Sequence, residues 1–219
     1  MILFDLVGDN EQDPAYQNLA IENGNRQYDF LRSVVGASLA VGRPFLSSNV
    51  LKALNFQAIV CLHAYAGEYR PCQVTVGGHV PPPHYRVQAL MDDFVNLVNR
   101  HWETADPVVL AAHVLWRLNW IHPFINGNGR TARAACYFVL CLKVQQWLPG
   151  SVILPDLIKR ERARYEQGLR AADASFAQGQ LDISELHALL SELINEQLGN
   201  GPPAAGATPP ANVPLLPSP

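Results

Sequence analysis

The sequence predicts an all-α protein, a bundle of helices with one small β-hairpin. Three observations support this prediction. Apolar residues recur at helical spacing through most of the chain, proline and glycine mark helix ends, and one segment alternates as a strand does. Of the 219 residues, 48% are hydrophobic and 16% are charged, which is typical of a chain that buries its core without disulfides.

Each helix is expected from its own signals. Ser47 or Ser48 can cap a helix that reaches about His63. A helix over 87–98 presents one apolar stripe, made of Val87, Leu90, Met91, Phe94, Leu97 and Val98. Asp106 before Pro107 begins the next helix, which ends at His122 because Pro123 disfavours the α conformation there.

The remaining helices lie further along the chain. Residues 130–144 are apolar nearly all round, which indicates a helix at the centre of the bundle. Another helix is expected over 156–177, and a last one begins at the capping-box spacing of Asp182 and Glu185. The sequence thus divides into an N-terminal helical segment over 1–46, a main domain over 47–198, and a tail rich in proline and glycine over 199–219. The tail is expected to be flexible, because it cannot bury enough apolar surface to offset its ordering entropy.

The expected hairpin lies in GEYRPCQVTVGGHVPPP, residues 67–83. Gln73, Val74, Thr75 and Val76 alternate in polarity before a Gly-Gly turn. We call residues 67–83 the flap. Its exposed edge is suited to recruiting an extended target by strand addition.

Composition excludes several classes of function. A net charge of -3 gives no electrostatic footprint for nucleic acid. The first residues turn acidic too early for a signal peptide, and the most apolar window, 134–142, is too short to cross a bilayer. The four cysteines have no zinc-site spacing. A cytoplasmic protein without membrane or nucleic-acid partners is therefore expected.

The segment HPFINGNGR, residues 122–130, carries the candidate chemistry. Arg130 and Arg133 lie in the first turn of a helix, where the helix dipole disfavours cations by roughly 0.3–1 kcal/mol each. They make sense if an anion occupies that helix N-terminus, and polyphosphate fits best. Gly127 and Gly129 would let the backbone approach the phosphates, and Asn128 could donate a hydrogen bond to one of them.

His122 is the candidate general base. It lies at the C-terminal end of the preceding helix, where carbonyl dipoles favour the protonated form and so raise its basicity. The short turn should place its imidazole across a small gap from the phosphate site, as a base must lie.

Together, His122, Pro123, Phe124, Gly127, Asn128, Gly129, Arg130 and Arg133 closely resemble the signature of the Fic family, whose best-known members transfer AMP from ATP to protein hydroxyls. The resemblance implies a Fic-type helical bundle over about residues 51–198. It also implies that His122 removes the proton from a Ser, Thr or Tyr hydroxyl, which attacks the α-phosphorus of ATP and releases pyrophosphate. Asn128, Arg130 and Arg133 would hold the α-, β- and γ-phosphates, around a nest shaped by Gly127 and Gly129.

Two further segments resemble parts of that family. The flap is similar to its target-docking flap, with Gln73 to Val76 as the docking strand, and Tyr165 to Ala172 is similar to the helix beside the nucleotide. The segment NLAIENGN, residues 18–25, resembles an inhibitory helix, although Asn18 replaces the usual hydroxyl residue. The resemblance implies that Glu22 pairs with Arg133 and blocks the γ-phosphate position. Expected partners are ATP, an unidentified target protein, and the chain itself through self-modification.

Asn126 departs from the pattern, because most AMP-transferring members have Asp or Glu there to hold Mg²⁺. A neutral amide implies weaker metal binding at this position, since a unit charge at close range is worth up to about 4 kcal/mol. The alternatives left open are reduced activity, a different donor or metal, a nucleotide-binding pseudoenzyme or interaction module, and transfer of another phosphate-containing group.

Overall fold

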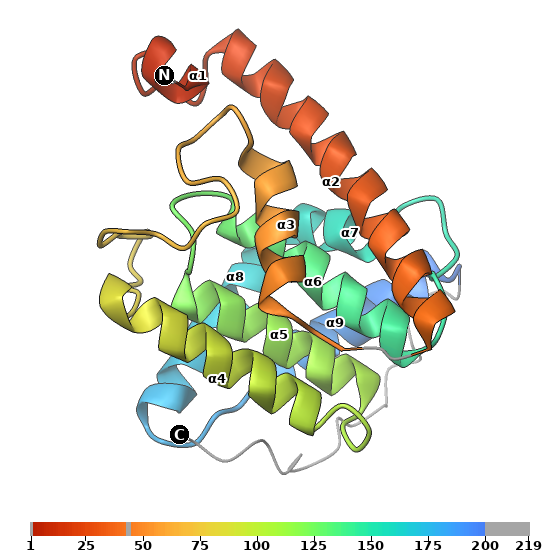
Figure 1. Cartoon of the computed structure of the whole chain (residues 1–219). Helices are drawn as coiled ribbons and strands as arrows, with labels where there is room; N and C mark the ends of the chain where they lie inside the picture. Colours follow the sequence, from red (N-terminus) through yellow and green to blue (C-terminus); the bar gives the residue numbers. More distant parts are fainter. Residues whose placement is uncertain (1, 43–44, 200–219) are drawn as a thin grey trace.

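Two antiparallel helices form the centre of the computed structural model, which describes residues 2–42 and 45–199 (Figure 1). They are α5 (Pro107–Ile121) and α6 (Asn128–Lys143), and they pack more extensively on each other than any other pair of described helices. Most of their side chains are buried. This confirms the prediction of a central helix near residues 130–144.

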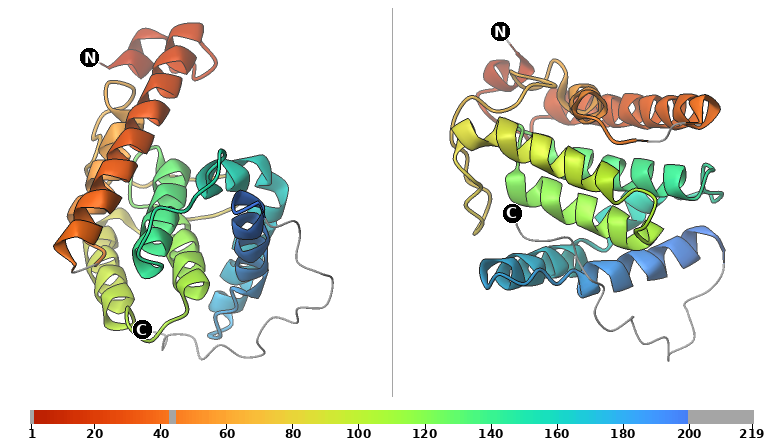
Figure 2. Two further views of the ribbon diagram at one scale, coloured as in Figure 1. Left: turned by 90° about the vertical axis from the view of Figure 1, so that its right-hand side faces the viewer. Right: turned by 60° about the horizontal axis from the view of Figure 1, so that its bottom comes forward.

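The other helices surround this pair in layers (Figure 2). On one side, α2 (Pro14–Val41) and α3 (Ser48–Ile59) pack on each other and on α6. On the other side lie α7 (Leu154–Arg160), α8 (Arg162–Ala177) and α9 (Ser184–Gln197), and α4 (Val87–Arg100) flanks α5. Two short elements, α1 (Leu3–Leu6) and the 3₁₀ turn η1 (His84–Arg86), complete the all-α fold.

Short polar side chains begin several of these helices. Asp13, Ser47 and Asp106 each accept a hydrogen bond from a backbone N–H in the first turn of α2, α3 and α5. Pro14 and Pro107 then occupy the first helical position, where no N–H is needed. The cap predicted at Asp106 is therefore confirmed.

The predicted β-hairpin does not form in the described part of the flap. Its only pairing is a single bridge between Val76 and His79 across the Gly-Gly turn, and Gln73, Val74 and Thr75 enter no strand. Pro71 and the proline run 81–83 donate no backbone hydrogen bonds, so the two legs cannot build a ladder.

Residues 200–219 of the predicted tail lie outside the described residues. Across the described helices, no apolar stretch is long enough to span a bilayer.

Candidate active site

The turn between α5 and α6 carries the HPFINGNGR sequence. α5 ends at Ile121, and His122 adopts a left-handed backbone with φ 51° and ψ 59°. Gly127, at φ 76°, precedes α6, and a Cβ atom there would lie 2.7 Å from Cγ2 of Ile59. Glycine is therefore required at this position, and the turn packs closely against α3.

Asn128 locks the turn from inside. Its Oδ1 accepts from the Phe124 N–H at 2.9 Å, and its Nδ2 donates to the Phe124 carbonyl at 2.8 Å. The side chains of both residues are buried. The phosphate contact expected of Asn128 is therefore not seen in this arrangement: its amide pairs with Phe124 at both ends, and it does not line the cavity described next.

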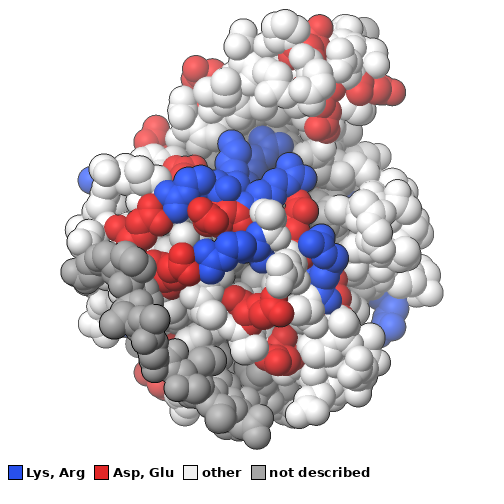
Figure 3. Space-filling view, turned by 180° about the vertical axis from the view of Figure 1, so that it is seen from behind, with Lys and Arg blue, Asp and Glu red and all other residues white. Residues whose placement is uncertain are grey.

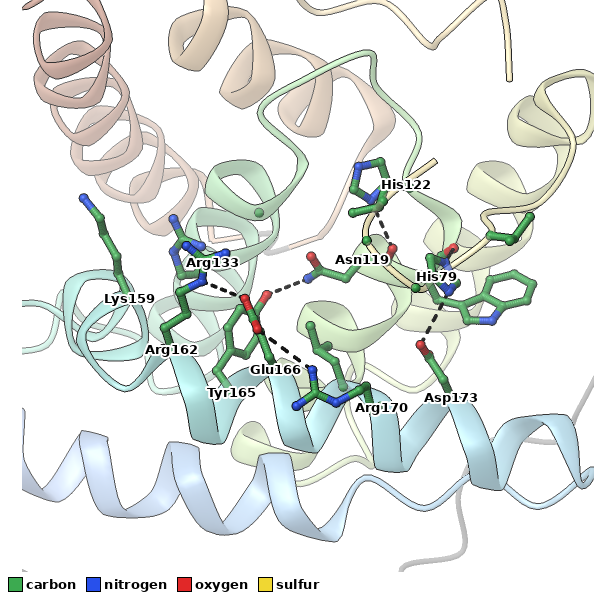
Figure 4. Close-up of a pocket in the computed structure, with 17 residues that line it drawn as sticks. His79, Asn119, His122, Arg133, Lys159, Arg162, Tyr165, Glu166, Arg170 and Asp173 are labelled. Atoms are coloured by element: carbon green, nitrogen blue, oxygen red, sulfur yellow. Dashed lines mark hydrogen bonds and ion pairs between the residues drawn. The ribbon is translucent and has the colours of Figure 1, made fainter. Parts of the chain in front are cut away.

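A cavity of about 820 Å³ opens beside the turn (Figure 4). Four of the expected site residues line it. They are His122 from the turn, Gly129 and Arg133 from α6, and Tyr165 from α8. On the surface, Lys and Arg side chains gather around a hollow with acidic residues among them (Figure 3). The rest of the lining comes from the flap, α5, α7 and α8: Val76, Gly77, Gly78, His79, Val80, Asn119, Trp120, Lys159, Arg162, Glu166, Leu169, Arg170 and Asp173.

His122 is neutral at physiological pH. Its pKa is lowered to about 4, mainly by burial and to a smaller extent by the charges of His79 and Arg70, although the Asn119 carbonyl favours the protonated ring. The expectation that the helix end raises its basicity is therefore wrong, because desolvation outweighs the carbonyl dipole. Nδ1 lies 3.4 Å from the Asn119 carbonyl oxygen. If Nδ1 carries the proton, as this contact favours, Nε2 is left as a proton acceptor.

Arg133 marks a cationic end of the cavity. It contacts the hydroxyl of Tyr165, which also accepts a hydrogen bond from Nδ2 of Asn119 at 2.8 Å. Burial raises the pKa of Tyr165 to about 12, so the phenol stays protonated. Lys159 and Arg162 lie on the same side of the cavity as Arg133 (Figure 4). An anionic group is favoured here.

His79 closes the opposite end of the cavity and ties the flap to the helices. Its Nε2 lies 2.9 Å from the Trp120 carbonyl oxygen, and its Nδ1 lies 3.6 Å from Oδ2 of Asp173 on α8. Oδ1 of Asp173 accepts from Nε1 of Trp116 at 2.8 Å. Burial raises the pKa of Asp173, whereas the hydrogen bond from Trp116 and the charge of His79 lower it. The flap is thus docked over the cavity.

Arg130 and Asn126 lie outside this cavity, on the side of the turn that faces α3. The Arg130 guanidinium donates to the Ala58 carbonyl at 2.6 Å and to Oδ1 of Asn126 at 3.4 Å. The β-phosphate contact expected of Arg130 is therefore not seen, because its side chain is held by α3. Gly127 lies beside it and does not line the cavity either.

Asn126 is fully engaged by other groups. Its Oδ1 accepts from the Gly127 N–H at 2.6 Å, and its Nδ2 donates to Oε1 of Glu11 at 3.0 Å. Within residues 2–42 and 45–199, no cluster of three or more His, Cys, Asp or Glu side chains could hold a metal ion. The Mg²⁺ site expected at Asn126 does not fit these contacts, because the amide oxygen is occupied and carries no charge.

Glu22 does not pair with Arg133 among the described ion pairs. It lies exposed on α2, whereas its neighbour Asn23 is buried and donates to the Val60 carbonyl at 2.9 Å. One turn later, Gln27 donates to the Leu54 carbonyl. These two amides fix which face of α2 meets α3, and adjacent residues of a helix point about 100° apart. The expected inhibitory contact is therefore absent from this arrangement.

Several residues of the site were not found from the sequence. Asn119 had a usable signal, since it is a polar residue one turn before His122 on a mostly apolar helix. Arg70 and His79 lie in the flap, where no periodic pattern shows what they contact. Glu11 is 115 residues from Asn126, and nothing in the chain indicates that contact.

The chain is similar to known proteins of one family. Residues 45–140 match the model of the Fic/DOC family. A protein adenylyltransferase Fic from Drosophila persimilis is 40% identical over 108 residues, which cover 49% of this chain and 20% of that relative. The equivalent protein from Drosophila melanogaster is 39% identical over the same length. The match thus spans about a fifth of these curated relatives.

Solved structures share the fold. Fic-1 from C. elegans superimposes with a TM-score of 0.63 at 22% identity, covering 82% of this chain and 50% of that one. The FIC domain of Bep5 from Bartonella clarridgeiae gives a TM-score of 0.57 at 18% identity, with 86% of each chain covered. Over residues 45–140 the chain therefore resembles the Fic/DOC family, and it shares its fold with these solved Fic structures.

Proposed function

We propose that the chain transfers AMP from ATP to a Ser, Thr or Tyr hydroxyl of a protein and releases pyrophosphate. One observation carries the proposal: the His122 imidazole, Gly129 at the start of α6, and Arg133 line the same cavity. Its volume of about 820 Å³ lies in the range of pockets that enclose a nucleotide-sized ligand. The Drosophila relatives, named as adenylyltransferases, support the same reaction.

The lining gives the nucleotide a direction. The triphosphate would lie near the N-terminal end of α6, where backbone N–H groups and the Arg133 guanidinium favour negative charge. Lys159 and Arg162 extend this cationic end. The adenine ring would lie toward Leu169 and Trp120, under the docked flap.

His122 would act as the base. The target hydroxyl oxygen forms a bond to the α-phosphorus, the bond to the β-phosphate oxygen breaks, and pyrophosphate leaves with that electron pair. The hydroxyl proton passes to Nε2 of His122. A pKa of about 4 makes the ring alone a weak base, and the negative charges of a bound triphosphate would raise that pKa toward neutrality. The residues of the chain supply positioning and cationic groups, as phosphoryl transfer generally requires.

The flap is proposed to receive the target. Val76 and Val80, at its turn, are exposed and also line the cavity. A target segment lying against them would bring its hydroxyl to the cavity edge, near His122. The legs form no strand ladder with each other, so the backbone groups that Arg70 and Gln73 do not bind could pair with such a segment.

The test is transfer of label from ATP. The protein would be incubated with Mg²⁺ and ATP labelled at either the α- or the γ-phosphate, alone and with lysate protein. The proposal expects α-label on protein, no γ-label, and loss of transfer in His122→Ala but not in His84→Ala, an exposed histidine on η1. Transfer of γ-label would instead indicate a kinase-like reaction, and binding without transfer would indicate a nucleotide-binding protein. The neutral Asn126 side chain, whose oxygen accepts from the Gly127 N–H, favours the nucleotide-binding protein as the second candidate.

Restraint by Glu22 would need a rearrangement. Because its carboxylate is exposed, α2 would have to turn or shift to bring it to Arg133. Glu22→Gly is then expected to raise self-modification, compared with Asp29→Gly, an exposed acid on the same helix. Equal labelling in the two variants would remove Glu22 from the account.

A further inference from the structure

Arg70 is a buried cation with no acidic partner. Its side chain is 2% exposed, and it makes no ion pair with any residue in the described ranges. Burial lowers its pKa, which reflects the cost of placing this charge out of water. A side chain that destabilises the fold in this way needs a compensating set of contacts.

Those contacts are backbone carbonyls from three separate places. Nε donates to the His122 carbonyl at 2.8 Å, Nη1 donates to the Cys72 carbonyl at 3.0 Å, and Nη2 donates to the Pro82 carbonyl. The Arg70 backbone N–H donates to the Pro123 carbonyl at 2.8 Å. One residue thus joins both legs of the flap to the two residues that follow α5.

The contact with His122 falls where the backbone is least favourable. His122 has φ 51°, a conformation that residues other than glycine, asparagine and aspartate seldom adopt. The His122 carbonyl lies beyond the end of α5, and it accepts a hydrogen bond from Nε–H of Arg70. Because the ring direction follows from this backbone, Arg70 helps to determine where the imidazole points.

The contacts with Cys72 and Pro82 hold the neck of the flap. Beyond the neck, the two legs are joined by the bridge between Val76 and His79 and by a contact from Gln73 to the Pro81 carbonyl, while His79 ties the tip to Trp120 and Asp173. With prolines in both legs, side chains must replace the missing ladder. Arg70 therefore joins the two legs of the flap, as the hydrogen bonds of a strand pair would in a hairpin.

We propose that Arg70 is a positioning residue that couples the order of the flap to the orientation of His122. Loosening its contacts makes the flap and the His122 imidazole mobile together. A target segment that orders the flap therefore also fixes the orientation of His122. The catalytic meaning of this coupling rests on the proposed transfer reaction, whereas the coupling itself does not.

Arginine is required for this role. Three donors on one planar group point to three carbonyls in different directions, and the single ammonium of lysine cannot reproduce that fork. Arg70→Lys keeps the charge and most of the apolar stem, so it separates geometry from charge. Arg86, exposed on η1 at the far end of the flap, gives a matched control.

The test is hydrogen exchange measured by mass spectrometry, in wild type, Arg70→Lys, Arg70→Gln and Arg86→Gln. We expect exchange to rise on the order of tenfold in Arg70→Lys, in both the flap tip (73–80) and the turn (122–127). Arg86→Gln should stay within about twofold of wild type in both. If Arg70→Gln fails to fold, Arg70→Lys still decides the question.

Three results would overturn the proposal. They are a rise in only one of the two segments, no rise in Arg70→Lys, or a uniform rise that includes α4 and α9, which would make Arg70 a residue of general stability. Kinetics supply a second readout: kcat should fall about tenfold in Arg70→Lys while KM for ATP changes less than about threefold. Because exchange needs no turnover, failure of the proposed transfer reaction would not disturb the exchange result.

Discussion

Asn126→Asp places a carboxylate beside the carboxylate of Glu11. In the structure, Nδ2 of Asn126 donates to Oε1 of Glu11 at 3.0 Å. The substitution replaces that donor with a second acceptor bearing a negative charge. The segment around Glu11 is otherwise held by α1, whose Leu3 and Phe4 N–H groups donate to the carbonyls of Cys61 and Leu62. We therefore expect Asn126→Asp to loosen the N-terminal segment, residues 2–13.

The size of the effect follows from distance and exposure. Two unit charges 3.0 Å apart repel by about 5.5 kcal/mol at an effective dielectric near 20, and by about 1.4 kcal/mol in bulk water. The Glu11 side chain is 49% exposed, which places the repulsion toward the lower value. Arg130 lies 3.4 Å from Oδ1 of Asn126 and would offset part of it. A net loss of about 1–2 kcal/mol in docking of the segment is expected.

A double-mutant cycle measures this coupling. Hydrogen exchange of residues 2–13 would be compared in wild type, Asn126→Asp, Glu11→Gln and the double variant. In the double variant, the amide of the introduced glutamine can donate to the introduced aspartate, so protection should return close to the wild-type level. An Asn126→Asp protein as protected as wild type would refute the reasoning, as would a double variant no better than the single one.

The remaining predictions concern the turn, the cavity and acid stability. Gly127→Ala should destabilise the fold by about 2 kcal/mol or more in urea titrations, because its Cβ would lie 2.7 Å from Ile59 at a positive φ; unchanged stability would contradict the packing. Tyr165→Phe removes the hydroxyl that contacts Arg133, and we expect a severalfold weaker affinity for ATP by calorimetry with the unfolding midpoint nearly unchanged. Burial lowers the pKa of His113 to about 3. As pH falls, the unfolded chain therefore takes up the proton before the folded protein does. The contribution of the neutral imidazole to the free energy of unfolding is full above pH 6.5 and is lost as pH drops toward 3. Urea midpoints in His113→Leu should fall less steeply than in wild type over that window, since each such histidine contributes about 1.4 kcal/mol per pH unit.

Most helices were predictable because their signals are local, although α3 ends at Ile59 and not near His63, and the helix expected over 156–177 is divided into α7 and α8. The Asp106-Pro107 start of α5 and its end before Pro123 each depend on residues next to one another. The apolar character of α6 marked it as central without knowledge of its neighbours. The flap was predicted as a hairpin from alternation and its Gly-Gly turn; the turn carries one bridge, but no strand ladder forms, because prolines and Arg70 determine how its legs are held.

The motif predicted which residues cluster, but not where each side chain points. His122 and Arg133 do face one cavity, whereas Arg130 is held by the Ala58 carbonyl of α3. That partner is 72 residues away in the chain, so no local pattern could show it. The pKa of His122 was predicted in the wrong direction for a similar reason, since burial, which depends on the tertiary packing, outweighs the carbonyl at the helix end.

A crystal structure with a non-hydrolysable ATP analogue carrying a methylene bridge between the α- and β-phosphorus tests the central claim most directly. The account predicts the triphosphate at Gly129 and Arg133, the adenine ring under the flap, and the α-phosphorus on the side of the cavity that His122 faces. A nucleotide bound with its phosphates away from Arg133, or with His122 turned out of the cavity, would contradict it.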